Sequence, residues 1–173
     1  MSLKLHVGCG SQRKPGYVNI DAFDPAADLR IPIEAIDYPP NSVEIVEGYM
    51  VIEHLDRSAA EQFVHKAFAM LVPGGRLILE CPDLVKVARL VLEFEDDLAM
   101  LEDGAFGFRG FFGEPKENMT AADYHKWGYS AKTLSALFFR AGFRPVLVGD
   151  GASHGYPIRD VRVEGVKPDD PAL

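Results

Sequence analysis

The chain has 173 residues, of which 47% are hydrophobic and 25% are charged, the balance of an ordinary globular domain. This length predicts a single domain over residues 1–173 with room for a sizeable core. The formal net charge of −8 argues against nucleic acid as the main partner, because surfaces that bind a phosphate backbone are usually basic. No apolar run approaches the ~20 residues that a membrane span needs.

An expected strand begins at Leu3, so the sequence leaves no room for a signal peptide. The only two cysteines, Cys9 and Cys81, are interpreted as reduced thiols. Together these features predict a cytoplasmic protein.

Two short apolar strands near the N-terminus each end on residues that suit a ligand. Residues 3–7 form the first strand, which runs into Gly8 and Gly10. Glycines at the mouth of a strand let a ligand approach bare backbone, because no Cβ stands in the way. Residues 17–20 form the second strand, and the acid that follows it, Asp21, can accept both hydroxyls of a ribose. The pattern predicts a pocket for an adenosine-containing cofactor.

The same region departs from the dinucleotide-binding fingerprint. Arg13 stands where that fingerprint has its third glycine, and Asp21 follows Gly10 by 11 residues, where about 20 are usual. The link from Gly10 to Tyr17 is too short for a crossover helix. These departures argue against a nicotinamide-dependent dehydrogenase.

The rest of the chain alternates between expected strands and helices. Ser58 is the expected N-cap of one helix, and Ser130 and Gly142 are the expected cap and stop of the last helix. The alternation predicts an α/β sheet with helices on its faces, and the last two strands form an antiparallel pair at one edge. The expected elements are strands at 28–31 (very short), 43–47, 76–81, 143–148 and 160–166, and helices at 58–71, 84–101 and 131–141.

With these elements in this order, the chain resembles class I S-adenosylmethionine (SAM)-dependent methyltransferases, and within them a small methyltransferase-11-like group. The resemblance implies a Rossmann-like sheet in the order 3-2-1-4-5-7-6, with strand 7 antiparallel. This chain departs from the family in one element, because its helix after strand 1 is expected to be shortened or missing. The resemblance implies SAM as the cofactor and S-adenosylhomocysteine (SAH) as the product. The matching segments are LHVGCG (5–10), VNID (18–21), ADLRIP (27–32), NSVEIVEGYMVIEHL (41–55), LVPGGRLILECPD (71–83) and YSAKTLSALFFRAGF (129–143).

The resemblance also implies a set of site residues. His54 and His125 are the candidate catalytic residues, because a histidine can act as a general base near neutral pH. The alternatives are a structural role for the pair Glu53 and His54, and a loop histidine at 125 that packs on Trp127. The expected cofactor-binding residues are His6, Gly8, Cys9, Gly10, Asp21, Asp28, Leu29, Tyr49 and Met50.

Some methyltransferases of this class carry a Glu-x-x-Glu-His metal motif, and this chain has Met50 in place of its first carboxylate. Glu53 and His54 alone are too few ligands for a tight site, so the sequence predicts that no metal is required. Residues 84–128 are interpreted as an insertion. Its part 103–128, rich in glycine and aromatic residues, is expected to be a lid with His125 and some aromatic side chains facing the cofactor.

The function expected from the resemblance is methyl transfer to a hydroxyl or amine of a small molecule or a sugar or glycan precursor. The alternative is a cofactor-binding protein without turnover, a regulator or a partner subunit that keeps the fold. The sequence indicates neither the acceptor nor the oligomeric state.

Overall fold

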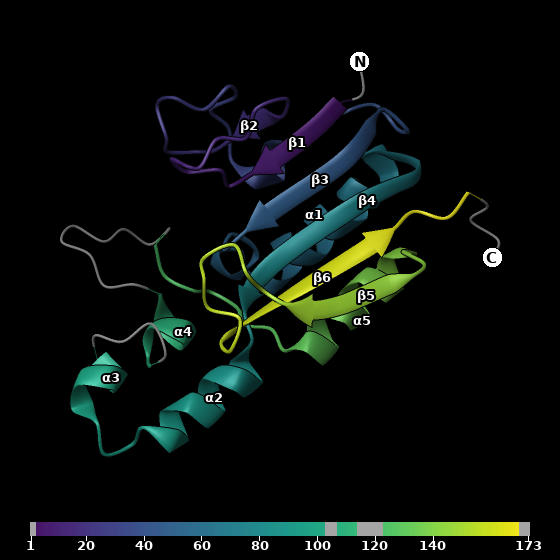
Figure 1. Cartoon of the computed structure of the whole chain (residues 1–173). Coiled ribbons are helices and arrows are strands. Elements are labelled where there is room, and N and C mark those ends of the chain that lie inside the picture. The colour runs from purple at the N-terminus through teal and green to yellow at the C-terminus, as the bar shows by residue number, and fades with distance from the viewer. Residues whose placement is uncertain (1–2, 103–106, 114–122, 170–173) are drawn as a thin grey trace.

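The computed structural model describes residues 3–102, 107–113 and 123–169. Its centre is a six-stranded sheet in the order β2-β1-β3-β4-β6-β5 (Figure 1). Strands β1 to β4 pair in parallel, and β6 runs antiparallel to both of its neighbours. This confirms the expected α/β class and the antiparallel pair at one edge. The strands are β1 (Leu3–Val7), β2 (Val18–Ile20), β3 (Val43–Tyr49), β4 (Leu71–Pro82), β5 (Val146–Asp150) and β6 (Asp160–Val166).

The outer edge beside β2 differs from the expected seven-stranded order. Where that order has its strand 3, the described residues form a single bridge between Ile20 and Leu29. Leu29 N donates to Asn19 O at 3.2 Å, and Asp21 N donates to Leu29 O at 3.1 Å. Pro32 follows and has no N–H to donate to a ladder. The six strands therefore stand in the order 2-1-4-5-7-6 of the family scheme, without its third strand.

The helices follow the expected alternation, and no helix lies between β1 and β2. The last helix has the expected ends: Ser130 Oγ accepts a hydrogen bond from Thr133 N at 3.2 Å, and Gly142 ends the helix with φ 108°. The helices are α1 (Arg57–Met70), α2 (Leu84–Glu93), α3 (Leu98–Glu102), α4 (Arg109–Phe112) and α5 (Ala131–Ala141), with 3₁₀ turns η1 (Ile33–Ala35) and η2 (Ile52–His54).

Two expectations about helix ends are wrong. The N-cap of α1 is Asp56 rather than Ser58, and its carboxylate accepts a backbone N–H of the first turn at 2.9 Å. A charged acceptor there also complements the positive end of the helix dipole. The single helix expected over 84–101 is divided into α2 and α3, because the Asp97 side chain accepts from Met100 N at 3.1 Å and starts a new helix.

The two faces of the sheet differ in chemistry. Helices α1 and α5 lie together behind the sheet in Figure 1 and pack on its apolar face. The other face carries the buried polar side chains of His6, Glu47 and Glu80, from the three neighbouring strands β1, β3 and β4. The apolar face forms the core, and the polar face extends toward the site described below. The largest buried side chains of the core include Phe63, Phe138, Phe143, Leu5, Leu77, Leu79, Leu134 and Leu137.

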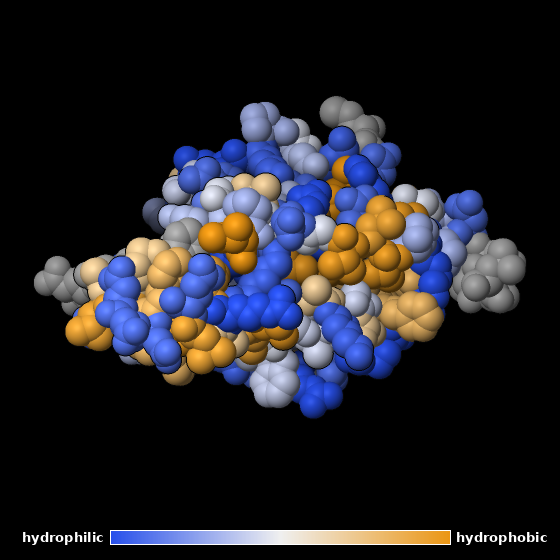
Figure 2. Space-filling view, turned by 60° about the horizontal axis from the view of Figure 1, so that its bottom comes forward, coloured by the Kyte–Doolittle hydropathy of each residue, from blue (hydrophilic) through white to orange (hydrophobic). Residues whose placement is uncertain are grey.

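Helices α2, α3 and α4 form an arm that projects from the carboxyl end of β4 (Figure 1). Val87 and Leu90 of α2 are buried, whereas Leu92, Leu98 and Phe112 are exposed. Figure 2 shows hydrophobic residues among hydrophilic ones on this part of the surface. None of the helices in the described ranges has the length and apolar character that a membrane span needs.

Candidate active site

An open cleft of about 1590 Å³ lies where β1, β2 and β3 end. Parallel strands of an α/β sheet present their ligand sites at this carboxyl end. Asp28 and Leu29 do not line the cleft. The cleft is lined by nine of the residues expected from the sequence, which are His6, Gly8, Cys9, Gly10, Asp21, Tyr49, Met50, His54 and His125.

The glycine turn after β1 has two glycines in the left-handed region, with φ 62° at Gly8 and φ 46° at Gly10. A Cβ on Gly8 would lie 2.3 Å from Cγ2 of Val51, whereas a Cβ on Gly10 would meet nothing within 4 Å. Gly8 is thus required both by its backbone conformation and by the close approach of Val51.

Asp21 holds this turn together. Its carboxylate accepts hydrogen bonds from Gly10 N at 2.9 Å, from Phe23 N at 2.8 Å and from Asp24 N at 2.9 Å. Burial alone would raise the pKa of Asp21, but the three backbone donors outweigh it and the pKa is lowered. A carboxylate has about four lone-pair positions, so one remains for a ligand in the cleft.

Asp28 is placed differently from the sequence expectation. Its carboxylate accepts from Asn19 N at 2.8 Å and from Asn19 Nδ2 at 2.9 Å, so it faces β2 rather than the cleft. Leu29 next to it is 38% exposed and takes part in the single bridge to Ile20.

Lys14 lies in the segment between β1 and β2 and lines the cleft. Its ammonium group donates to Glu47 and to Tyr49 Oη at 3.1 Å, and it lies 4.4 Å from the centre of the Tyr49 ring. Burial alone would lower the pKa of Lys14, but its bonds to Glu47 and Tyr49 leave the pKa raised. No local pattern in the sequence predicts this role, because the partners of Lys14 lie 33 and 35 residues further along the chain.

At the strand ends the cleft is lined by His6 and Cys9, which are buried, and by Met50, which is half-buried. His6 is 2% exposed, and burial lowers its pKa. Met50 has φ 51°, a left-handed backbone that bulky side chains rarely adopt. Burial raises the pKa of Cys9 to about 11. Cys9 and Cys81 are buried and not joined by a disulfide.

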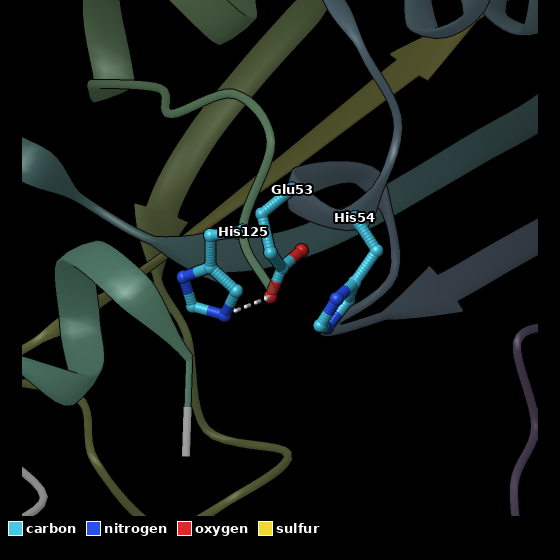
Figure 3. Close-up of side chains that lie close together, drawn as sticks. All are labelled: Glu53, His54 and His125. Carbon is cyan, nitrogen blue, oxygen red and sulfur yellow. Dashed lines mark ion pairs between the residues drawn. The ribbon is translucent and has the colours of Figure 1, made fainter. Parts of the chain in front are cut away.

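A second group of side chains that line the cleft, Glu53, His54 and His125, lies close together (Figure 3). Glu53 and His54 belong to η2, directly after β3, and His125 comes from the segment after α4. Lys126 N and Trp127 N both donate to Glu53 O, at 2.8 and 3.2 Å. These backbone bonds fix His125 beside Glu53, and the two imidazole rings lie 5.0 Å apart at 81°.

The buried carboxyl group of Glu53 is the least expected feature of the site. Glu53 is 2% exposed, and neither of its oxygens has a hydrogen-bond partner among the residues that the structure describes. Burial raises the pKa of Glu53 to about 8 and lowers the pKa of His125 to about 4. Their contact of 4.0 Å therefore joins a largely protonated carboxyl group to a neutral imidazole at pH 7.

Both histidines are held by backbone carbonyls. His54 Nδ1 lies 3.3 Å from Tyr124 O, and His125 Nδ1 lies 3.3 Å from Gly110 O. A carbonyl oxygen can only accept, so each Nδ1 carries the proton and donates. Each Nε2 is then the atom that bears a lone pair.

The loop between β5 and β6 also lines the cleft, and it bonds to charged side chains of the neighbouring strands. Arg159 donates to both oxygens of Asp160, at 2.6 and 3.0 Å, so the negative charge of Asp160 offsets the positive charge of Arg159. Glu80 accepts from Ala152 N at 3.0 Å and from Ser153 N at 2.8 Å. Neither Arg159 nor Glu80 is among the site residues expected from the sequence.

The expected lid is described in part. Residues 103–106 and 114–122 lie outside the described residues. Of the remainder, Arg109, Asp123, His125 and Lys126 line the cleft. The aromatic side chains of the described part do not line it, contrary to the expectation, and Phe112 and Tyr124 are 64% and 50% exposed.

Solved structures with a similar fold come from several organisms. A SAM-dependent methyltransferase from Archaeoglobus fulgidus superposes with a TM-score of 0.60 and 12% identity, over 96% of this chain and 86% of that one. A SAM-dependent methyltransferase from Thermotoga maritima has a TM-score of 0.59 and 16% identity, over 96% of this chain and 82% of that one.

A third structure carries its ligands. The 1,6-didemethyltoxoflavin-N1-methyltransferase of Burkholderia thailandensis, with 1,6-didemethyltoxoflavin and SAH bound, has a TM-score of 0.62 and 12% identity, over 97% of this chain and 72% of that one. No family model matches the sequence, and no curated protein matches it either. The comparisons confirm the resemblance at the level of the fold, which is that of class I SAM-dependent methyltransferases.

Proposed function

We propose that the chain binds SAM in the cleft and transfers its methyl group to a hydroxyl or amine of a small molecule or a sugar precursor. The observation that carries this proposal is the position of the cleft. It lies at the carboxyl ends of β1, β2 and β3 of a methyltransferase fold, between the glycine turn and Asp21 on one side and Glu53, His54 and His125 on the other. A cofactor and an acceptor need two such adjoining regions.

The glycine turn and Asp21 are the proposed cofactor side. Gly8 lets the chain turn beneath Val51, bare backbone at Gly10 admits the cofactor, and the remaining lone pair of Asp21 accepts a ribose hydroxyl. Tyr49 and Met50 line the cleft at the carboxyl end of β3. The proposed methyl-transfer point is therefore above the end of β3.

The reaction requires few catalytic groups from the protein. The acceptor oxygen or nitrogen forms a bond to the methyl carbon while the carbon–sulfur bond of the sulfonium breaks, and the acceptor proton passes to a base or to water. SAH and the methylated acceptor are the products. The protein has to hold the acceptor in line with the methyl group and exclude water.

The two candidate bases are not equivalent. The low pKa of His125, about 4 because of burial, makes its imidazole a weak base at neutral pH. His54, at the edge of the same group, is the better candidate for taking a proton from a hydroxyl acceptor. His125 is the proposed partner that orients the acceptor.

Replacing Asp21 by alanine is expected to weaken SAH binding roughly tenfold to a hundredfold, since a hydrogen bond to a charged group is worth ~1.5–3 kcal/mol. Isothermal titration calorimetry measures this against the exposed acid Asp37, whose alanine variant is the matched control and binds like the wild type. Unchanged affinity in Asp21→Ala would remove Asp21 from the site.

An activity assay separates an enzyme from a cofactor-binding protein without turnover. Purified protein is incubated with SAM and a panel of small hydroxyl and amine compounds, and SAH is measured by mass spectrometry. SAH formed in the presence of an acceptor, and not without it, supports the enzyme. Tight SAH binding with no product for any acceptor favours the non-catalytic alternative.

A further inference from the structure

Glu53, His54 and His125 bring three candidate metal ligands to one place (Figure 3). One atom of each side chain lies within 4.8 Å of the other two. Ligand atoms bonded to zinc at about 2.0–2.2 Å stand closer together than this, so binding draws the side chains inward by small rotations. The backbone also holds Glu53 beside His125, because Glu53 O accepts hydrogen bonds from the N–H groups of Lys126 and Trp127.

The oxygens of Glu53 are an independent observation that points to a ligand. They are buried, line the cleft and have no hydrogen-bond partner among the described residues. A buried carboxyl group without partners is costly. A cation between Glu53 and the imidazoles supplies the missing partner for both oxygens.

The histidines are oriented as metal-binding histidines usually are. In most such sites the ring nitrogen that does not bind the metal donates its N–H to a backbone carbonyl or a carboxylate. His54 Nδ1 and His125 Nδ1 make this bond to Tyr124 O and Gly110 O. His125 Nε2 then faces Glu53 Oε1 at 4.0 Å.

We propose that Glu53, His54 and His125 bind one divalent transition-metal ion of the zinc type. Two imidazole nitrogens and one carboxylate form a donor set that suits such ions, whereas Mg²⁺ prefers oxygen ligands alone. The prediction of no metal was based on Glu53 and His54, without a carboxylate at position 50. The third ligand comes from residue 125, which the fold places beside them.

A metal ion at this site would also restrict which compounds can accept the methyl group. This step rests on the proposed methyl transfer. Three protein ligands are typical of catalytic zinc sites, which keep a position open for water or substrate. A hydroxyl bound at that position would lose its proton more readily, and it would lose it to water, because the metal would occupy the lone pair of His54. The inferred acceptor is therefore a hydroxyl compound rather than an amine.

Metal binding can be measured without SAM or acceptor. Wild-type protein is stripped with a chelator, freed of it, and titrated with Zn²⁺ by calorimetry and with Co²⁺ by visible absorption. We expect one Zn²⁺ per chain and no binding of Mg²⁺. His54→Ala, His125→Ala and Glu53→Gln should each weaken Zn²⁺ binding roughly 10–100-fold or more, since loss of an outer-shell partner alone costs that much.

His65→Ala is the matched control, because His65 lies exposed on α1 and its loss should leave binding unchanged. Thermal unfolding checks that each variant is folded. If His125→Ala does not fold, Glu53→Gln still tests the proposal. The proposal is overturned if the wild type binds no Zn²⁺, or if His65→Ala weakens binding as much as His125→Ala. Intact Zn²⁺ binding without methyl transfer would count against the proposed function alone.

Discussion

Replacing Gly8 by alanine should destabilise the protein by about 2–5 kcal/mol, from a left-handed backbone costing ~1–2 kcal/mol and overpacking costing ~1–3 kcal/mol. The new Cβ would lie 2.3 Å from Cγ2 and 2.7 Å from Cβ of Val51, a stiff side chain that cannot move its Cβ away. The same change should displace the turn that faces the proposed cofactor. Binding of SAH should therefore be lost together with stability.

Gly10→Ala is the matched control for this prediction. Gly10 shares the left-handed backbone, with φ 46°, but a Cβ there meets nothing within 4 Å. Its cost should be only the ~1–2 kcal/mol of the backbone conformation. Urea unfolding of the two variants and the wild type measures the difference, and equal losses at the two glycines would show that Val51 does not constrain the turn.

The stability of the metal-free protein should fall by about 1–2 kcal/mol between pH 6.5 and pH 8, because of Glu53. Burial raises the pKa of Glu53 from 4.5 to about 8. Between these two values the unfolded chain has lost its proton and the folded chain keeps it. The folded state thus binds more protons, and raising the pH favours the unfolded state.

His125 acts with the opposite sign and at lower pH. Its pKa is lowered from 6.5 to about 4, so between these values the unfolded chain binds the extra proton and stability rises with pH. This contribution is nearly complete at pH 6.5. The fall above pH 6.5 can therefore be assigned to Glu53.

Urea unfolding at pH 6.5 and pH 8 with chelator present measures this effect. Glu53→Gln keeps the size of the side chain and removes its titration, so its stability should be nearly the same at both pH values. If the wild type and Glu53→Gln changed by the same amount, the carboxyl group would not be the cause.

Local signals in the sequence predicted much of the fold. The helix over 131–141 and the strand over 160–166 have the expected ends, because a serine cap and a glycine stop are short-range features. The helix 84–101 was mispredicted because apolar spacing alone does not reveal the cap at Asp97. The missing third strand depends on pairing with β2, a tertiary contact.

The site was predictable where it follows a strand end and not elsewhere. Gly8 and Asp21 stand next to strands and line the cleft as expected. The group of Glu53 and His125 joins residues 72 positions apart, and no periodicity marks the segment that brings them together. Tertiary contacts alone bury Glu53 and direct the Asp28 carboxylate toward Asn19 of β2.

We infer that the cleft at the ends of β1, β2 and β3 is the SAM site. Adding SAH to ¹⁵N-labelled protein and following the backbone amide signals by NMR tests it most directly. We predict saturable shifts at Gly8, Gly10, Asp21 and Met50, and none at Gly74, at the opposite end of the sheet. Shifts confined to residues around Gly74, or no shifts in a folded protein at millimolar SAH, would contradict the account.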